Sequence, residues 1–188
     1  MMQQRAFGWL VLALVAFAIS GCANMTVGSH VERTADFGVY HTFAWVAPDA
    51  LPTGDSRLND NAFFRDHVIG AVQKQLMLRG MNETTVDVAD LLVHYHANVM
   101  PRVEVGATHN VYANGNVARE PELFSFEQGT LVVDVVDART EALVWRGWAQ
   151  DAVNPDDWDR LHRQLDEAVP RMFAQFPMSL HRGDVSAK

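Results

Sequence analysis

The sequence predicts an α+β fold, in which two amphipathic helices cover one face of a mostly antiparallel β-sheet. Segments 36–46, 90–105 and 129–153 are rich in β-branched and aromatic residues or alternate between apolar and polar residues, as strands do. Segments 58–81 and 154–177 instead repeat apolar residues every three or four positions, as amphipathic helices do. The expected order is strand, helix, strand, an optional further strand, two hairpin strands and helix. We expect the second face of the sheet to be partly exposed to solvent.

The first 21 residues are typical of an export signal. Arg5 and the amino terminus supply positive charge, and the apolar run 6–18 is too short to cross a bilayer comfortably as a permanent helix. Residues 19–22 (Ile-Ser-Gly-Cys) resemble the bacterial lipobox, in which small residues precede a cysteine that becomes a thioether to diacylglycerol. We therefore predict a lipoprotein signal peptide at 1–21 and lipidation of Cys22, with acyl chains such as palmitate.

The residues that follow Cys22 indicate where such a lipoprotein would be held. Ala23 stands where an aspartate would resemble the inner-membrane retention signal, so we expect the periplasmic face of the outer membrane. Two or three acyl chains would anchor the chain durably. Residues 22–34 are polar and show no apolar period, which predicts a tether, followed by one α+β domain at 35–181 and a tail at 182–188.

Composition argues against several classes of function. The formal net charge of -8 over 188 residues disfavours nucleic acid and a broad electrostatic contact with anionic lipid. Cys22 is the only cysteine, so its lipidation would leave no thiol for a disulfide, a nucleophile or a thiolate metal site. The chain also has no serine-hydrolase elbow and no phosphate-binding glycine loop. We therefore expect neither an enzyme nor a cofactor.

The first predicted helix, within 58–81, has a four-residue apolar period. Asn59 or Asp60 could cap its first N–H groups, and Gly80 stands where a left-handed residue would end it. The expected buried stripe consists of Phe63, Phe64, Val68, Ile69, Val72 and Leu76.

The second predicted strand, 90–105, separates two sets of side chains by alternation. One face would carry Val93, Tyr95, Ala97 and Val99, and the other Leu92, His94, His96 and Asn98. Pro101 removes a backbone donor, so the strand should end, bulge or lie on an edge there. From 106 to 128 we expect a long irregular excursion, which could include short hairpin strands, with Asn114-Gly115 as a turn and Pro121 as a breaker.

The segment 129–153 predicts a hairpin that places Asp134 opposite Arg146 and Val135 opposite Trp145. The last helix would start with Asn154 as its cap and Pro155 at its first position. We assign Asp156, Asp157 and Asp159 to this helix start rather than to a calcium loop, which needs alternating oxygen ligands. The expected buried stripe of this helix is Trp158, Leu161, Leu165, Val169, Met172 and Phe173, with a kink at Pro170.

Several spaced blocks resemble a bacterial lipoprotein family, the domain of unknown function 4136. The blocks are Asp36-Phe37 with Tyr40-His41-Thr42-Phe43-Ala44-Trp45, Ala89-Asp90-Leu91-Leu92-Val93 with Tyr95-His96, Gly129-Thr130-Leu131-Val132-Val133-Asp134, Leu143-Val144-Trp145-Arg146-Gly147 and Phe176-Pro177. The resemblance covers nearly all of the chain after the signal and implies a lipid-anchored α+β domain without an agreed activity. Glu141 departs from it, because it stands where a glycine is expected in the hairpin loop. Pro170 departs too, because it interrupts the last helix.

Two hypotheses for function remain open. The favoured one is a noncatalytic binding or structural module of the envelope, whose partner, a protein or a lipid, meets the uncovered sheet face or the excursion. A small-molecule transport accessory is a variant that needs an apolar pocket between helices and sheet. The rival is a metal site on His94 and His96, with His109 or an acid as a third ligand. Most of the five tryptophans suit a buried core rather than sugar stacking, but Trp148 shares the face of Arg146.

Overall fold

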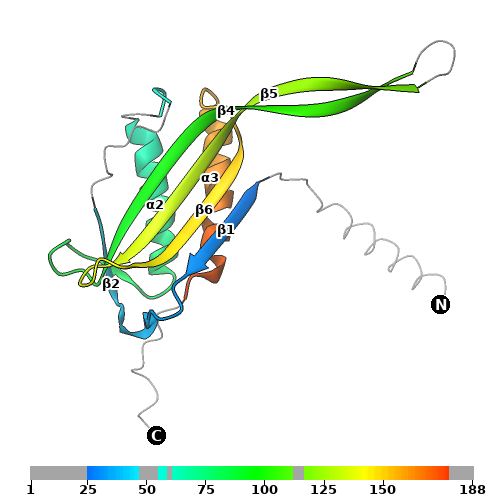
Figure 1. Ribbon diagram of the computed structural model, residues 1–188. Coiled ribbons are helices and arrows are strands. Elements are labelled where there is room, and N and C mark those ends of the chain that lie inside the picture. Colours follow the sequence, from blue (N-terminus) through cyan, green and yellow to red (C-terminus); the bar gives the residue numbers. More distant parts are fainter. Residues whose placement is uncertain (1–24, 47–54, 59–60, 112–116, 178–188) are drawn as a thin grey trace, which may run out of the picture.

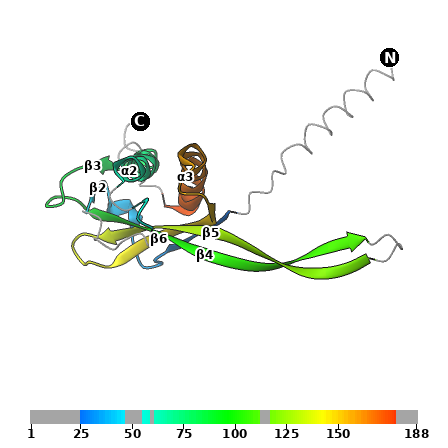
Figure 2. The same cartoon turned by 90° about the horizontal axis from the view of Figure 1, so that it is seen from above.

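The computed structural model describes residues 25–46, 55–58, 61–111 and 117–177. Two helices, α2 (Ala62–Met77) and α3 (Trp158–Met172), pack on one face of a six-stranded sheet (Figures 1 and 2). The strands are β1 (Thr26–Val31), β2 (Thr42–Trp45), β3 (Asn82–Glu83), β4 (Leu91–Val111), β5 (Val117–Asp137) and β6 (Leu143–Val153). Two short 3₁₀ turns, η2 (Phe37–Val39) and η3 (Phe173–Gln175), complete the described elements.

The strand order is β1-β6-β5-β4-β2-β3. β1, β6, β5 and β4 pair in antiparallel fashion, whereas β2 and β3 add parallel strands at one edge. This mixed but mostly antiparallel sheet, covered on one face by two helices, confirms the predicted α+β class.

The core lies between the helices and the covered sheet face. Trp145 of β6 is fully buried, and its ring centroid lies 4.5 Å from that of Phe173 and 5.1 Å from that of Phe176. The predicted four-residue stripe of α2, from Phe64 to Leu76, is buried as expected. Phe63 is a correction, because it lies one position off that stripe and is exposed.

The two ends of α2 show how local sequence sets its length. The side chain of Asn61 accepts the N–H of Phe64 at 3.0 Å, so Asn61 is the N-cap; Asn59 and Asp60 lie outside the described residues. At the other end Gly80 has a φ of 86°, the left-handed conformation predicted for it. The N–H of Met81 then reaches the carbonyl of Leu76 at 3.2 Å, closing a Schellman-type end.

The start of α3 corrects the predicted cap. Asp157, not Asn154, accepts the N–H of Arg160 at 3.0 Å, and the helix begins at Trp158. Asn154 instead closes the preceding turn, with its side chain accepting the N–H of Asp156 at 3.1 Å. α3 continues two residues beyond Pro170 before η3 begins.

Strand β1 corrects the predicted tether. Residues 26–31 lie within the stretch that showed no apolar period, yet they pair with β6 from Thr26–Gln150 to Val31–Trp145. The guanidinium of Arg171 in α3 also donates to the carbonyl of Met25 at 3.3 Å. β1 is therefore held by the edge of β6 and by α3, which are tertiary contacts that no local pattern reports. Residues 1–24 and 178–188, which include the predicted signal, Cys22 and the C-terminal tail, lie outside the described residues.

A second correction concerns the excursion expected at 106–128. β4 and β5 instead pair continuously from Leu91–Asp137 to Val111–Val117, and they project beyond the sheet as a two-stranded ribbon (Figures 1 and 2). The predicted Asn114-Gly115 turn lies outside the described residues. The predicted faces of β4 are confirmed, because Val93 and Val99 are buried on the helix side while Asn98 is exposed.

Backbone direction explains how the ribbon accommodates its prolines. The carbonyl of Val93 accepts the N–H of Val46 at 3.1 Å, away from β5, whereas the carbonyl of Asp90 accepts the N–H of Ala138 at 2.9 Å, on the β5 side. Because the register with β5 is unbroken, every odd-numbered residue of β4 directs its backbone groups away from β5.

Pro101 is such an odd-numbered residue, and Pro121 pairs with odd-numbered Ala107. Both prolines therefore lack a donor only on the outer edges of the ribbon, where no described strand pairs with them. Of the three alternatives predicted for Pro101, the edge position is the one observed. The expectation that Pro121 interrupts regular structure is wrong, because Pro121 lies within β5 and its missing donor also faces outward.

The β5–β6 hairpin matches its predicted register, with Asp134 opposite Arg146 and Val135 opposite Trp145. Its loop contains Glu141, whose φ of 59° is the only positive φ of a non-glycine residue in the described chain. The N–H of Glu141 donates to the carbonyl of Asp137 at 2.9 Å, which holds this strained conformation in place.

We predict that Glu141→Gly stabilises the protein by about 0.5–1 kcal/mol, because glycine adopts a left-handed backbone without a Cβ penalty. Urea unfolding of the two proteins measures the difference. Arg139→Gly is the matched control, since Arg139 lies in the same exposed loop without a positive φ and should lose stability. Equal destabilisation by both substitutions would contradict the strain assigned to Glu141.

Candidate functional site

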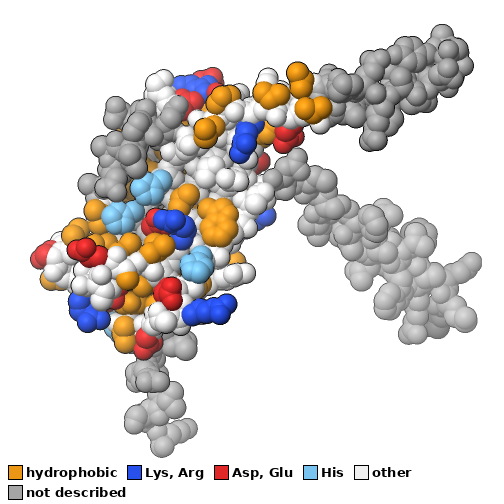
Figure 3. All heavy atoms as spheres, in the orientation of Figure 1, with side chains coloured by type: hydrophobic (Ala, Val, Ile, Leu, Met, Phe, Trp, Pro, Cys, Tyr) orange, Lys and Arg blue, Asp and Glu red, His pale blue; other side chains and the backbone are white. Residues whose placement is uncertain are grey.

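The sheet face opposite the helices is the candidate site. No described helix covers it, and Figure 3 looks onto it, with histidine, arginine and acidic side chains gathered around apolar ones over the sheet. We call it the open face. Its strand positions within the body of the sheet include Gly28, His30, Leu92, His94, His96, Asn98, Thr130, Val132, Asp134, Arg146, Trp148 and Gln150.

An ion pair lies at the centre of the open face. Arg146 donates from Nε and Nη2 to the two carboxylate oxygens of Asp134, each at 2.6 Å, which is bidentate geometry. The side chain of Asp134 is only 10% exposed, whereas that of Arg146 is 48% exposed. The hydrogen bonds to Asp134 raise the pKa of Arg146. The pair therefore presents a fixed guanidinium to solvent and covers its carboxylate.

Histidines flank this ion pair on both sides. The register aligns His30, Arg146, Asp134 and His94 in one row across four strands. His96 follows in the next row of the same face, so the predicted side-by-side placement of His94 and His96 is confirmed. Asp134 is the only acid at open-face positions of the body strands as described, although the whole chain carries a net charge of -8. The described body strands of this face thus carry one paired acid, although the whole chain is acidic.

Trp148 is the aromatic residue of the open face, as its alternation with Arg146 predicted. It pairs with Gly28 of β1, and a Cβ built on Gly28 would lie 2.3 Å from an indole carbon. The indole therefore lies across the glycine backbone, half-buried on the sheet. Of the other tryptophans predicted to be core, Trp145 is fully buried, while Trp45 and Trp158 are partly buried against the core.

The predicted metal ligands come together only in part. His94 and His96 share the open face, but the side chain of His109 lies outside the described residues. Among the side chains that the structure describes, no group of three or more histidine, cysteine or acidic residues is placed to hold a metal ion. Asp157 caps α3 and Asp159 lies in its first turn, which agrees with their assignment to the helix start, whereas Asp156 accepts a hydrogen bond from Arg57.

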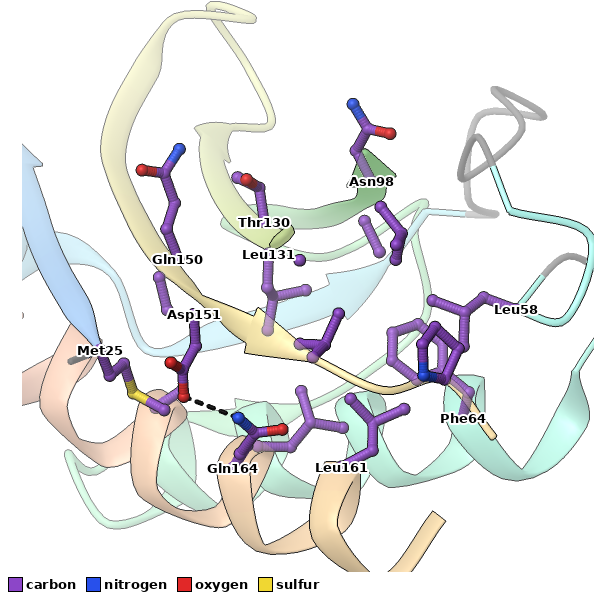
Figure 4. Close-up of a pocket in the computed structure, with 18 residues that line it drawn as sticks. Met25, Leu58, Phe64, Asn98, Thr130, Leu131, Gln150, Asp151, Leu161 and Gln164 are labelled. Carbon is purple, nitrogen blue, oxygen red and sulfur yellow. Dashed lines mark hydrogen bonds between the residues drawn. The ribbon is translucent and has the colours of Figure 1, made fainter. Parts of the chain in front are cut away.

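An apolar cavity of about 50 Å³ lies between the sheet and the helices (Figure 4). Met25, Leu131 and Leu161 point into it, and Gln164 closes one side by donating to Asp151 at 2.7 Å. Pockets for drug-sized ligands measure roughly 300–1,000 Å³. The cavity is too small for the ligand-transport variant, which required a pocket at this place.

A second hollow, of about 490 Å³, opens at the hairpin end of the sheet, and two of its carboxylates accept backbone N–H groups of the chain around it. Tyr40 donates to Asp137 at 2.8 Å, and Asp137 also accepts the N–H groups of Arg139 and Thr140. Asp90 likewise accepts the N–H groups of His41 and Thr42. Burial raises the pKa of both carboxyl groups, but these hydrogen bonds outweigh it and hold each pKa below its ordinary value.

Sequence patterns missed an ion cluster around Arg57. Its guanidinium bonds Asp55, Glu127 at 2.7 Å and Asp156 at 2.9 Å. These partners come from three parts of the chain far apart in sequence, so only the fold brings them together. Arg57 thereby ties the chain before α2 to the turn before α3 and to the place where the ribbon leaves the sheet.

Comparison with known proteins identifies the family. The model of the family described as domain of unknown function 4136 (DUF4136) matches residues 27–178. The chain belongs to this family. No curated protein matches it. Within the described part of this DUF4136 chain, no helix is both long and apolar enough to span a membrane.

Two solved structures share the fold of the DUF4136 chain at low identity, and a third is similar to a lesser degree. A DUF4136 family protein from Bacteroides thetaiotaomicron is 12% identical with a TM-score of 0.50, over 81% of this chain and 95% of that one. A PDZ domain protein from Parabacteroides distasonis is 17% identical with a TM-score of 0.54, over 81% of this chain but only 36% of that one. PelC from Paraburkholderia phytofirmans, a dodecamer, is 10% identical over 80% of this chain and 95% of that one, with a TM-score of 0.45.

For this DUF4136 chain we predict that Tyr40→Phe costs about 1 kcal/mol of stability near neutral pH, because Asp137 loses one of its donors. The carboxyl of Asp137 has a lowered pKa, so its contribution is present above the ordinary aspartate pKa and is lost as pH falls through the folded value. The difference from wild type should therefore shrink in acid.

Urea unfolding at about pH 7 and at about pH 2, well below the ordinary aspartate pKa, measures this difference. Tyr95→Phe is the control, because no hydrogen bond is present at the hydroxyl of Tyr95 among the described residues. A Tyr40→Phe penalty that does not change between the two pH values would exclude the link to Asp137.

Proposed function

We propose that this DUF4136 protein is a noncatalytic binding module of the bacterial envelope, held at the periplasmic face of the outer membrane by lipid on Cys22. The observation that carries the binding role is the open face. A sheet face without a covering helix can be solvated by scattered polar side chains. This face has more than that, because the guanidinium of Arg146 is held in one position by the covered carboxylate of Asp134. Histidines flank the pair in register, and a half-buried indole lies one row away.

The chemistry of this face suits a protein partner that presents carboxylates. Arg146 is locked in bidentate geometry, so little side-chain entropy would be lost when it binds a further acceptor. Arginine and tryptophan are the residue types enriched at interface hot spots. The buried carboxylate of Asp137 accepts loop N–H groups, and the part-buried carboxylate of Asp90 accepts N–H groups at the start of β2. These bonds support a structural rather than a catalytic use of the two acids.

Photo-crosslinking in native cells tests this proposal. A crosslinker at Thr130 or Gln150, both on the open face, should capture an envelope protein, whereas one at Arg163 or Glu167, exposed on α3, should not. Replacing the ion pair by Asp134→Asn with Arg146→Gln should reduce the open-face yield about tenfold, because the charge-assisted contact is lost. Thermal unfolding of the double variant controls for folding. Capture from α3 positions alone, or of lipid alone, would contradict a protein-binding open face.

The alternative function is a metal-dependent site, which the shared face of His94 and His96 favours. Two imidazoles supply half of a tetrahedral zinc site, so a further ligand would be required. Zinc titration followed by calorimetry, with elemental analysis of the purified protein, compares wild type with the His94→Ala, His96→Ala variant. Stoichiometric zinc in wild type and none in the variant would establish the alternative. Metal-free wild type that also fails to bind zinc would remove it.

A further inference from the structure

The ribbon carries exposed apolar side chains where it leaves the sheet. We define the proximal ribbon as residues 100–105 of β4 and 123–128 of β5. β6 pairs with β5 only as far as Glu127, so most of this segment is two-stranded and lies beyond both helices (Figures 1 and 2). Val103 is 64% exposed, and Val105 and Leu123 are each 71% exposed. Such a cluster on a projecting element is typical of a contact surface.

Alternation divides the proximal ribbon into two unlike faces. Val103 and Val105 pair with Ser125 and Leu123, so these four side chains lie on one side of the ribbon. Pro101 lies on the same side. The one charged residue of this side is Glu127, which lies where the ribbon leaves the sheet and is paired with Arg57. We call the rest of this side the uncharged face. Arg102 and Glu104 lie on the other side with Phe124 and Phe126. The uncharged face is therefore the one whose burial costs least desolvation.

The edges of the ribbon are poor sites for strand addition. Pro101 on β4 and Pro121 on β5 each remove an outward donor, as natural edge strands do to avoid pairing. A partner would therefore meet a face of the ribbon, not extend its hydrogen-bonded ladder.

The position of Cys22 indicates what meets that face. Thr26, the first residue of β1, follows Cys22 by four positions, so an extended chain between them spans about 14 Å at most. Thr26 pairs with Gln150, and the ribbon begins beyond Val153, three residues further along β6, or about 10 Å. A lipid on Cys22, which belongs to the proposed function, would thus hold the bilayer surface at the same end of the sheet from which the ribbon projects.

We propose that the uncharged face of the proximal ribbon contacts the lipid bilayer and forms a second membrane attachment beside Cys22. This inference rests on the lipidation in the proposed function for its geometry, but the contact itself is made by ribbon side chains. The acidic chain gains little from anionic headgroups, so the contact depends on apolar burial and should not prefer anionic lipid.

A Cys22→Ser chain that begins at residue 22, without the apolar signal 1–21, tests the contact without the anchor. It contains no cysteine, so an environment-sensitive fluorophore can be placed at Val105→Cys or Leu123→Cys on the uncharged face. Val88→Cys, exposed in the turn before β4, is the matched control. With zwitterionic phosphatidylcholine vesicles the ribbon labels should shift to the blue and the control label should not. Adding phosphatidylglycerol should leave the ribbon shift unchanged.

Substitution measures how much the apolar side chains contribute. In the Cys22→Ser chain, Val103→Ser with Leu123→Ser should lower vesicle partitioning by about tenfold or more, whereas Val86→Ser with Val88→Ser should leave it unchanged. Labels that remain in water with vesicles would overturn the proposal. A blue shift without vesicles that grows with protein concentration would also overturn it, because a second copy would then cover the face.

These outcomes are separable from those of the proposed function. The vesicle assay uses a chain without the lipidated cysteine, so it reports on the ribbon alone. If Cys22 carries lipid in cells and the ribbon labels stay in water, the anchor stands and the ribbon contact fails. If Cys22 is unmodified, the proposed anchor fails and the ribbon result is judged from the vesicles.

Discussion

Burial of one face of the sheet under α2 and α3 is the constraint on which the other features depend. The two helices direct their apolar stripes to the same face, where Trp145 packs against Phe173 and Phe176. That arrangement leaves the opposite face to be stabilised by polar groups compatible with water. The bidentate pair of Arg146 and Asp134 meets this requirement, because it satisfies a covered carboxylate and leaves a cation in solvent.

The unequal length of the strands gives the molecule two different ends. At the hairpin end, Asp137 accepts N–H groups of the hairpin loop, and Asp90 accepts the N–H of Thr42 at the start of β2. Glu141 in the same loop stores the strain of a left-handed backbone. At the other end, β4 and β5 extend beyond β2 and β6 and form the ribbon. Arg57 connects the start of the ribbon to the body through its ion pair with Glu127. β1 also begins at this second end, so the ribbon and the proposed anchor share one side of the molecule.

Sequence patterns predict those structural features that are set by residues close in the chain or directly opposite in a hairpin. The α+β class, the stripe of α2, the faces of β4 and the pair of Asp134 with Arg146 follow from periodicity and register. β1 could not be predicted, because Gly28, Ser29 and His30 interrupt any alternation of apolar and polar residues, and the strand is ordered by its pairing with β6. The alignment of His30 with the pair of Arg146 and Asp134 could not be predicted either, because it depends on the pairing of β1 with β6. The ribbon was missed because Pro101 and Pro121 break strands in general, and only the register shows that both face outward.

The central claim is that the folded body is held against a membrane at the end where β1 begins and the ribbon leaves. Mass spectrometry of the N-terminal fragment, from protein purified out of native envelopes, tests this claim most directly. A fragment that starts at Cys22 and carries a diacylglyceryl thioether with an acylated amino group is expected. A fragment that starts at Met1 with an unmodified thiol at Cys22 would contradict the claim.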